Sequence, residues 1–317
     1  MSNVLITGIT GFIGSNLVKY LNKSSNINVF GQSRDPDRAK EIFGDMIRLC
    51  VRDVSSDWLD ENNINTIVHL AGIAHDIKGK YKEKDYYHVN FEATRDLYSR
   101  FLASSTSSKF IFLSSVKAVA DTCEDILDES VEPEPVTPYG KSKLEAEKAI
   151  LHGIKTGKQA YILRPAMVYG PGNKGNLNLL YRFVKSGLPY PLAAFENKRS
   201  FLSVHNLCFI VDSLIMQHVP SGIYHLSDGN DLSTNELVDI IGEAGDKHPN
   251  KWSVPKLIIR SIASIGTIFK LPFNKQTLQK LTESYRVSNK RITEVLGDMP
   301  YKTQDELINT IHSIDEH

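Results

Sequence analysis

Apolar residues in the first 170 positions form short runs, and these runs alternate with stretches in which apolar residues recur at helical spacing. Short runs bounded by glycine, proline or small polar residues are typical of strands, whereas a period near 3.6 is typical of amphipathic helices. We therefore predict strands within residues 4–7, 27–34, 46–51, 64–72, 109–116 and 159–172. Helices are predicted within residues 15–21, 86–102 and 139–149. Strands that alternate with helices build a parallel sheet, so the pattern predicts an α/β fold with a doubly wound, Rossmann-type sheet.

The pattern changes after residue 172, where loops and short helices carry isolated polar residues. Helical spacing returns over residues 204–218 and an apolar run over 223–226, and Ser233 and Glu236 form a capping box that is typical of a helix start. We predict that residues 1–170 and about 200–227 form the Rossmann domain. Residues 171–199 and about 228–317 are predicted to form a smaller, mixed C-terminal domain that binds the substrate.

Residues 257–273 are rich in isoleucine, leucine and phenylalanine. The segment is short for a membrane span, contains Arg260 and Lys270, and has Pro272 near its end. We interpret it as a helix that faces the core of the second domain. Peripheral contact with a membrane is the alternative, and it is not the one expected.

The composition excludes several classes of protein. The chain has 317 residues, of which 41% are hydrophobic and 23% charged, and its formal net charge is zero, which argues against a dedicated nucleic-acid-binding protein. The three cysteines are too widely separated for a disulfide framework or a zinc site. Because the apolar N-terminus reads as a strand and not as a signal peptide, we expect a cytoplasmic protein in a reducing compartment. No metal site is expected.

Three glycines with the spacing G-x-x-G-x-x-G follow the first predicted strand. Gly8 allows a backbone conformation that a side chain would hinder, Gly11 lets the backbone approach a phosphate, and Gly14 lets the next helix pack closely on the strand. The N-terminus of that helix presents N–H groups and a partial positive charge to an anion. The stretch therefore predicts a turn that binds the pyrophosphate of a dinucleotide, although its spacing differs by one residue from the common fingerprint.

Further candidate ligands of a dinucleotide follow the second and fourth predicted strands. Ser33 and Arg34 stand where an acidic residue would bind the ribose of NAD, so this position favours the 2′-phosphate of NADP. Leu70, Ala71 and Gly72 end a strand and leave room for the cofactor, and Asn90 is expected to join them. We interpret His69 as a packed, hydrogen-bonded histidine. His75, in the loop beyond, is a candidate contact of the substrate.

Tyr139 and Lys143 carry the predicted chemistry. They are four residues apart on a predicted helix, so both project from one face. A phenol titrates near pH 10, and a neighbouring ammonium is expected to lower its pKa by favouring the phenolate. Ser115, which ends a neighbouring strand, can hydrogen-bond the same oxygen atom. The three residues could move a proton on and off a sugar oxygen while a nicotinamide carries a hydride.

Taken in order, these motifs resemble those of the extended short-chain dehydrogenases/reductases, in the branch of NAD-dependent nucleotide-sugar epimerases and dehydratases. Six blocks over the first 170 residues carry the resemblance, and they are Thr7-Gly8-x-x-Gly11-x-x-Gly14, Asp53-Val54, His69 to Gly72, Ser114-Ser115, Tyr139-x-x-x-Lys143 and Arg164-Pro165-x-x-Val168-Tyr169-Gly170. The C-terminal part adds Gly175-Asn176 and the run from Arg199 to Val204.

The resemblance implies roles for individual residues. Tyr139 would be the acid/base, Lys143 its electrostatic partner and a ligand of the nicotinamide ribose, and Ser115 a donor that polarises the sugar oxygen. The remaining implied contacts of the cofactor are Gly8, Gly11, Phe12, Ile13 and Gly14 at the pyrophosphate, Asp53 and Val54 at adenine, and Pro165 and Val168 at the carboxamide. Asn176 and Arg199 would hold the diphosphate of a UDP-sugar. Family members often form homodimers through the helix of the Tyr-x-x-x-Lys pair.

The sequence also departs from the family. Val116 and Lys117 stand where 4,6-dehydratases carry an Asp-Glu pair, so β-elimination lacks its acid and base and no dehydratase activity is expected. Lys117 is either a contact of the substrate or a surface lysine.

Two reactions at C4 remain open, and both fit enzymes that make sugars of surface polysaccharides. Arg34 and the stretch from Ser114 to Lys117 favour a 4-ketoreductase that consumes NAD(P)H, and a UDP-sugar 4-epimerase with bound NAD is the alternative. A non-catalytic NADPH-binding regulator and a reductase of non-sugar carbonyls are further alternatives. The presence of both Tyr139 and Lys143 argues against the regulator.

Overall fold

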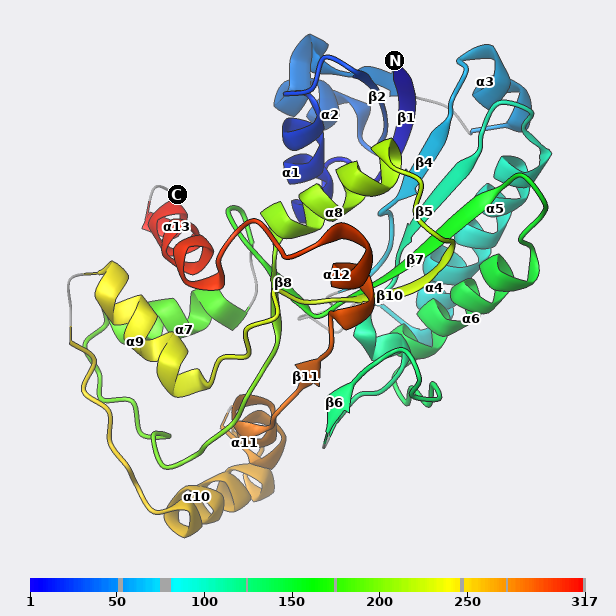
Figure 1. The fold of residues 1–317 in the computed structure, drawn as a ribbon. Helices are drawn as coiled ribbons and strands as arrows, with labels where there is room; N and C mark the ends of the chain where they lie inside the picture. Colours follow the sequence, from blue (N-terminus) through cyan, green and yellow to red (C-terminus); the bar gives the residue numbers. More distant parts are fainter. Residues whose placement is uncertain are drawn as a thin grey trace.

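A computed structural model of the chain describes residues 1–50, 54–74, 81–123, 125–173, 176–245, 248–271 and 273–315. Its centre is a seven-stranded sheet in which every neighbouring pair of strands is parallel (Figure 1). The strands, in spatial order, are β10 (Gly222–Leu226), β7 (Gln159–Pro165), β5 (Lys109–Leu113), β4 (Thr66–His69), β1 (Ser2–Thr7), β2 (Ile27–Gln32) and β3 (Arg48–Cys50).

The strand order reverses between β1 and β4. The chain runs outward from β1 through β2 to β3, then returns to β4 on the other side of β1 and continues outward through β5, β7 and β10. Thr7, the last residue of β1, pairs with Gln32 on one side and with His69 on the other. In open parallel sheets, ligands bind beyond the carboxyl ends of the strands at such a reversal. The topology therefore brings the glycine turn and the end of β4 to one place.

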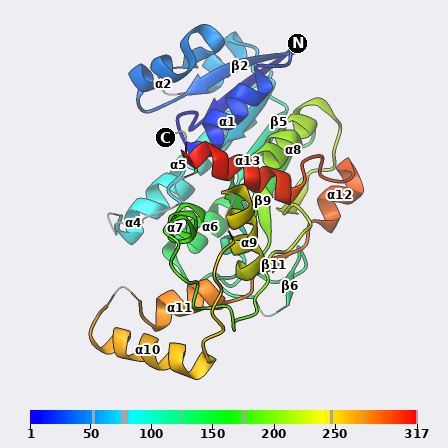
Figure 2. The same cartoon turned by 90° about the vertical axis from the view of Figure 1, so that its left-hand side faces the viewer.

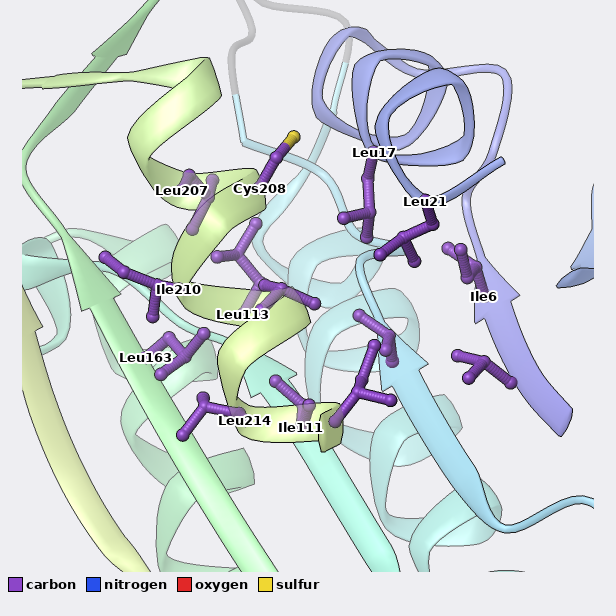
Figure 3. Close-up of a cluster of buried hydrophobic side chains, with 14 of the residues drawn as sticks. Ile6, Leu17, Leu21, Ile111, Leu113, Leu163, Leu207, Cys208, Ile210 and Leu214 are labelled. Atoms are coloured by element: carbon purple, nitrogen blue, oxygen red, sulfur yellow. The ribbon is translucent and has the colours of Figure 1, made fainter. Parts of the chain in front are cut away.

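Helices cover both faces of the sheet, which confirms the predicted doubly wound α/β fold. One face packs on α1 (Phe12–Leu21), α2 (Pro36–Phe43), α8 (Val204–Met216) and α12 (Lys290–Leu296). The close-up in Figure 3 shows side chains of α1 and α8, among them Leu17, Leu21 and Leu214, meeting those of the strands. The opposite face packs on α3 (Ser56–Glu61), α5 (Ala93–Ala103) and α6 (Pro138–His152).

A second hydrophobic cluster lies in the C-terminal part of the chain. Its helices are α7 (Asn176–Lys185), α9 (Thr234–Ala244), α10 (Lys256–Ile268), α11 (Lys275–Thr282) and α13 (Thr303–Asp315). Two small parallel sheets accompany them, formed by β8 (Met167–Tyr169) with β9 (Phe201–Ser203) and by β6 (Ile126–Leu127) with β11 (Arg286–Val287). These helices lie to the left of and below the central sheet in Figure 1, and Figure 2 views the molecule from that side. The proposed domain boundaries stay a prediction.

The predicted elements are confirmed with two differences. The helix expected over residues 86–102 is interrupted, because α4 (Glu83–Tyr86) passes into a π-helical turn, Tyr87–Glu92, before α5 begins. The segment 257–273 does contain a helix, α10 (Lys256–Ile268), but only part of that helix faces the core. Ile259, Ala263 and Gly266 are buried, while its other apolar residues are exposed. None of the helices in the described part of the chain has the length and apolarity that a bilayer crossing requires.

Candidate active site

The glycine turn after β1 has the geometry of a close backbone approach. Gly8 has φ of +72°, and a Cβ atom there would lie 2.9 Å from the backbone nitrogen of Ala71. A Cβ atom on Gly14 would lie 2.3 Å from the carbonyl oxygen of Gly8. Both contacts are far inside normal van der Waals separation, so any side chain would displace the turn from the start of α1 or from the end of β4. The sequence analysis expected Gly8 for its backbone conformation and Gly14 for the close packing of the helix on the strand.

The start of α1 suits an anion such as a pyrophosphate. Gly11 is the N-cap residue and has no side chain that could occupy the first backbone N–H groups, and the first turn contains no acidic residue. Phe12 and Ile13 are the first helical residues, so their N–H groups lie at the positive end of the helix dipole. The residues present therefore fit the phosphate-binding role that the sequence predicts.

A series of buried hydrogen bonds holds the carboxyl ends of β1 and β4 together, at the point where the strand order reverses. The Thr7 hydroxyl lies 2.7 Å from His69 Nδ1 and accepts the N–H of Ala71 at 3.1 Å. The other ring nitrogen of His69 lies 2.9 Å from the Thr94 hydroxyl. Burial lowers the pKa of His69 to about 3, and Lys143 acts in the same direction. His69 is therefore neutral and structural, as the sequence indicated.

Gly72 lets two polar side chains approach the loop after β4. A Cβ atom on Gly72 would lie 3.0 Å from Asn90 Oδ1 and 3.3 Å from Lys143 Nζ. The Asn90 amide accepts the N–H of Ile73 at 2.8 Å and donates to the Ile73 carbonyl and to the Ser142 hydroxyl. Asn90 thus clamps this loop onto α6 from the π-helical turn, a local geometry that is common at functional sites. Its direct contact with a cofactor stays a prediction.

Helix α6 and the end of β5 bring Ser115, Tyr139 and Lys143 together. Helix α6 begins at Pro138, and the Thr137 hydroxyl caps it by accepting the N–H of Gly140. Tyr139 is thereby placed in the first turn, where it hydrogen-bonds with Ser115 beyond the end of β5. One turn further along, Lys143 is buried and donates from Nζ to the Leu113 carbonyl at 2.8 Å.

The expected pKa of the phenol requires a correction. Burial raises the pKa of Tyr139 to about 12, and the hydrogen bond from Ser115 opposes this shift only in part. Lys143 does not lower it, because its ammonium is directed at the Leu113 carbonyl and the ring of Phe112. Burial also lowers the pKa of Lys143 itself, to about 8. Desolvation therefore outweighs the attraction that the sequence analysis expected from Lys143.

Sequence reasoning missed a buried ion pair directly behind this group. Glu147 lies one turn beyond Lys143 on α6 and pairs with Arg164 of β7 at 2.6 Å. Its carboxylate also accepts the hydroxyl of Ser114, and Arg164 Nη1 lies 3.3 Å from His225 Nε2. Glu147 raises the pKa of Lys143, in opposition to burial. The available signal was that Glu147 is four residues after Lys143, on the face of α6 that packs on the sheet.

The end of β2 lies beside the glycine turn. The Gly8 N–H donates to the Gln32 carbonyl at 3.1 Å, and the hydroxyls of Thr10 and Ser33 lie 3.5 Å apart. Arg34 is exposed next to them. The carboxylate of Asp35 accepts the N–H of Arg38 and caps α2. Asp35 is thus an acidic residue near the position where a ribose-binding acid would stand, but its carboxylate caps α2.

The other predicted cofactor contacts are distributed around this edge. Pro165 ends β7, and Val168 lies in β8. Val54 has a fully buried side chain and its carbonyl accepts a hydrogen bond from Arg100, so its side chain is part of the core. Asp53 and His75 lie outside the described residues. Asn176 begins α7, and its side chain is also outside the description.

Two cations predicted to meet the substrate lie in one neighbourhood. Lys117 Nζ donates to the Asp121 carbonyl and lies 4.1 Å from the ring centre of Tyr285. The Arg199 backbone bridges to Tyr285, and its guanidinium donates to the carbonyls of Glu283 and Lys280. Burial lowers the pKa of Lys117, and the charges of Asp121 and Glu283 oppose this shift. The Glu283 carboxylate lies 3.9 Å from Arg199 Nη2 and offsets part of the positive charge. The donors of the two cations still suit a dianionic group such as a diphosphate.

Comparisons with known proteins agree with this geometry. The sequence model of the NAD dependent epimerase/dehydratase family matches residues 4–226. A UDP-glucose 4-epimerase from Vibrio cholerae is 32% identical over 314 residues, which cover 96% of this chain and 92% of that protein. The N-acetyl-alpha-D-glucosaminyl-diphospho-ditrans,octacis-undecaprenol 4-epimerase of Escherichia coli O157:H7 is 28% identical over 262 residues, which cover 80% of this chain and 75% of that protein.

The fold is also shared with solved structures. The crystal structure of UDP-glucuronic acid 4-epimerase from Bacillus cereus in complex with NAD superposes with a TM-score of 0.75. The two chains are 18% identical, and the match covers 99% of each. At that identity the similarity establishes a common fold and nothing finer.

Proposed function

Because this chain belongs to the NAD dependent epimerase/dehydratase family, we propose that it moves a hydride at C4 of a UDP-hexose or UDP-N-acetylhexosamine. The observation that carries the proposal is the convergence of Ser115, Tyr139 and Lys143 beside the glycine turn of Gly8. A proton-transfer group next to a pyrophosphate-binding turn is the arrangement that hydride chemistry on an alcohol requires.

Each residue has a defined part in the proposed reaction. The C4 hydroxyl gives its proton to Tyr139 as the C4 hydride leaves, and Ser115 donates a hydrogen bond to the C4 oxygen. A nicotinamide held here would accept the hydride, and Tyr139 would act as the phenolate that takes up the proton. Lys143 holds the adjacent ribose, while Gly11, Phe12 and Ile13 hold the pyrophosphate. Lys117 and Arg199 are proposed to neutralise the diphosphate of the sugar nucleotide.

The same residues serve an epimerase and a ketoreductase. An epimerase returns the hydride to the other face of C4 and keeps its cofactor, whereas a 4-ketoreductase consumes one NAD(P)H per turnover. The near full-length similarity to a UDP-glucose 4-epimerase supports the epimerase, which we propose first. The stretch from Ser114 to Lys117 and the exposed Arg34 support the 4-ketoreductase, which we keep as the second candidate.

We propose NAD as the cofactor of the epimerase reaction. The related fold from Bacillus cereus holds NAD, and the comparisons give no support to the preference for NADP that Ser33 and Arg34 suggested. The two cofactors can be compared directly by titration. If Arg34 binds a 2′-phosphate, the Arg34→Ala variant will weaken NADP binding and leave NAD binding unchanged.

We also propose that the enzyme does not catalyse 4,6-dehydration. Val116 packs in a buried apolar cluster and Lys117 donates to the Asp121 carbonyl, so neither provides a carboxyl group at this position. Detection of a 4-keto-6-deoxy product from a UDP-hexose would contradict this proposal.

A sugar carried on a polyprenyl diphosphate is a second candidate substrate. The Escherichia coli relative acts on such a compound by name, and the exposed apolar face of α10 is the observation that favours it here. The sugar and the diphosphate are common to both candidates, so the proposed roles of Tyr139 and Arg199 do not change.

The central experiment compares the wild-type protein with the Tyr139→Phe variant. UDP-glucose, UDP-N-acetylglucosamine and a polyprenyl-diphosphate N-acetylglucosamine are each incubated with NAD, and the sugar products are separated. We expect C4 epimers from the wild type and a loss of at least about a thousandfold in the variant, which should still bind NAD. Net loss of NADH with a 4-keto sugar would support the ketoreductase instead. Cofactor binding with no turnover of any of these compounds would favour the non-catalytic regulator.

A further inference from the structure

Helix α10 presents a continuous apolar face to solvent. Ile258, Ile262, Ile265 and Phe269 follow one another at a spacing of three or four residues, and each is about half exposed or more. Leu257 and Ile268, which flank this row, are 77% and 75% exposed. We call these six residues the α10 face. Single exposed apolar residues are ordinary, but a contiguous group of this size marks an interaction surface.

The opposite side of α10 is firmly attached to the protein. Ile259 and Ala263 are buried in the C-terminal cluster. Gly266 packs so closely on the segment before α11 that a Cβ atom would lie 1.9 Å from the Phe273 carbonyl oxygen. This packing fixes the rotation of the helix about its axis, so the six apolar side chains cannot turn inward.

The polar groups of α10 leave its apolar face undisturbed. The hydroxyls of Ser261, Ser264 and Thr267 each donate to a backbone carbonyl one turn earlier in the helix. A hydroxyl bonded in this way no longer needs water, which lowers the cost of transferring the helix surface into a less polar medium.

The segment that carries α10 is strongly basic. Residues 248–282 contain no aspartate or glutamate, and their lysines and arginines are Lys251, Lys256, Arg260, Lys270, Lys275 and Lys280. Lys251 pairs with Asp239 of α9. Lys256 Nζ lies 5.8 Å from the ring centre of Phe195, a buried residue of the C-terminal cluster. Within the described part of the chain, Arg260, Lys270 and Lys275 form no ion pair. This local excess of positive charge contrasts with a chain whose net charge is zero.

We propose that the α10 face docks on the surface of a membrane that contains anionic lipids. An apolar helix face bordered by lysine and arginine is the pattern that binds a bilayer interface, with the helix lying in the plane of the surface. The apolar side chains enter the boundary of the acyl chains, and the cations face the lipid phosphates. The helix contributes an interfacial contact and does not cross the bilayer.

The positive charge near α10 favours an anionic lipid surface over a second copy of the chain as the binding partner. In a two-fold symmetric dimer, the same surface is contributed by both subunits, so the cations around one α10 face would meet those around the other. Like charges brought together in this way oppose association. An anionic lipid surface supplies the complementary charge instead.

The location of α10 relates membrane docking to the proposed diphosphate site. The helix lies at the end of the molecule opposite the N-terminal strand in both Figures 1 and 2, next to α11. The last turn of α11 and the residue after it provide the Lys280 and Glu283 carbonyls that hold Arg199. Docking would therefore bring the proposed diphosphate site close to the lipid surface. The docking proposal does not depend on the proposed function, because lipid binding and catalysis are measured separately.

Vesicle flotation tests the proposal with the full-length protein. We expect the wild type to float with vesicles of phosphatidylcholine and phosphatidylglycerol and to stay unbound with vesicles of phosphatidylcholine alone. The variant Ile262→Gln/Ile265→Gln/Phe269→Gln should bind at least about a hundredfold more weakly, since it removes three apolar side chains from the interface. The matched control is Ile154→Gln/Met216→Gln, which changes exposed apolar residues elsewhere and should bind like the wild type.

A second variant keeps the test informative if the triple variant is unstable. Phe269→Trp is a conservative change at a side chain that is 70% exposed. Its added fluorescence should shift to the blue on addition of the anionic vesicles and be quenched by brominated lipid. No flotation of the wild type and no spectral shift would overturn the proposal. A dimer that the triple Gln variant disrupts, without vesicle binding by the wild type, would also overturn it and would assign the α10 face to a second copy.

Discussion

Gly140 lies so close to Lys117 that a Cβ atom on Gly140 would come within 2.3 Å of the Lys117 carbonyl oxygen. This contact joins the first turn of α6, which carries Tyr139, to the short 3-10 helix Val116–Ala118 that follows Ser115. The clash would be between the Cβ atom of residue 140 and a backbone oxygen atom, so no side-chain rotation could relieve it. The approach of Tyr139 to Ser115 therefore depends on the absence of a side chain at residue 140.

We predict that Gly140→Ala separates Tyr139 from Ser115. Overpacking of this kind costs about 1–3 kcal/mol of stability, and a displacement of about 1 Å at the reacting groups can reduce kcat about a hundredfold. The measurement is steady-state turnover together with thermal unfolding. Gly245→Ala is the matched control, because a Cβ atom there would be 3.5 Å from its nearest neighbour and turnover should be unchanged. Wild-type turnover by Gly140→Ala would contradict the role of this contact.

The buried pair of Glu147 and Arg164 makes a prediction about stability. Glu147→Gln leaves the Arg164 guanidinium buried without its counter-charge, which should lower the free energy of unfolding by about 3–5 kcal/mol. Glu145→Gln on the same helix removes the exposed partner of Lys148 and should cost less than about 1 kcal/mol. Urea unfolding of both variants at neutral pH measures the difference. Equal losses would mean that the buried pair has no special weight.

The sequence predicted the fold because its signals were local and repeated. The Gly8 and Gly14 positions and the alternation of strands and helices each have a short-range cause, and the structure confirms them. The pKa of Tyr139 could not be predicted, since it depends on burial by elements that are distant in sequence. The same limit explains α10. A helix rich in isoleucine and leucine usually lies in a core, and only the packing of Ile259 and Gly266 shows which side faces outward.

Lys143 makes a prediction about the pH dependence of cofactor binding. Burial lowers its pKa to about 8, so the ammonium proposed to hold the nicotinamide ribose is present below that pH and lost above it. The affinity of the cofactor-free protein for NAD should therefore be constant near pH 7 and fall by up to about tenfold per pH unit above pH 8. Calorimetric titration at several pH values tests this. In Lys143→Arg the guanidinium stays charged, and the decline should disappear. A wild-type affinity that is flat to pH 10 would place the pKa of Lys143 elsewhere.

The fully buried His225 makes a prediction about acid stability. Burial lowers its pKa from 6.5 to about 4, with Arg164 acting in the same direction. A histidine whose pKa is depressed by folding contributes stability above its unfolded pKa, and this contribution is lost as the pH falls from about 6.5 to 4. At pH 5 the loss from His225 should be about 2 kcal/mol relative to pH 7.

Other groups titrate between pH 7 and 5, so the effect of His225 is measured as the difference in pH dependence between the wild type and His225→Gln. Burial raises the pKa of Asp228 to about 6, which stabilises the fold as the pH falls and so opposes the effect of His225. His69 and Asp228 are common to both proteins and cancel when the pH dependence of His225→Gln is subtracted from that of the wild type. The variant should lose about 2 kcal/mol less than the wild type between pH 7 and 5. Identical slopes for His225→Gln and the wild type would contradict the lowered pKa of His225 in the folded protein.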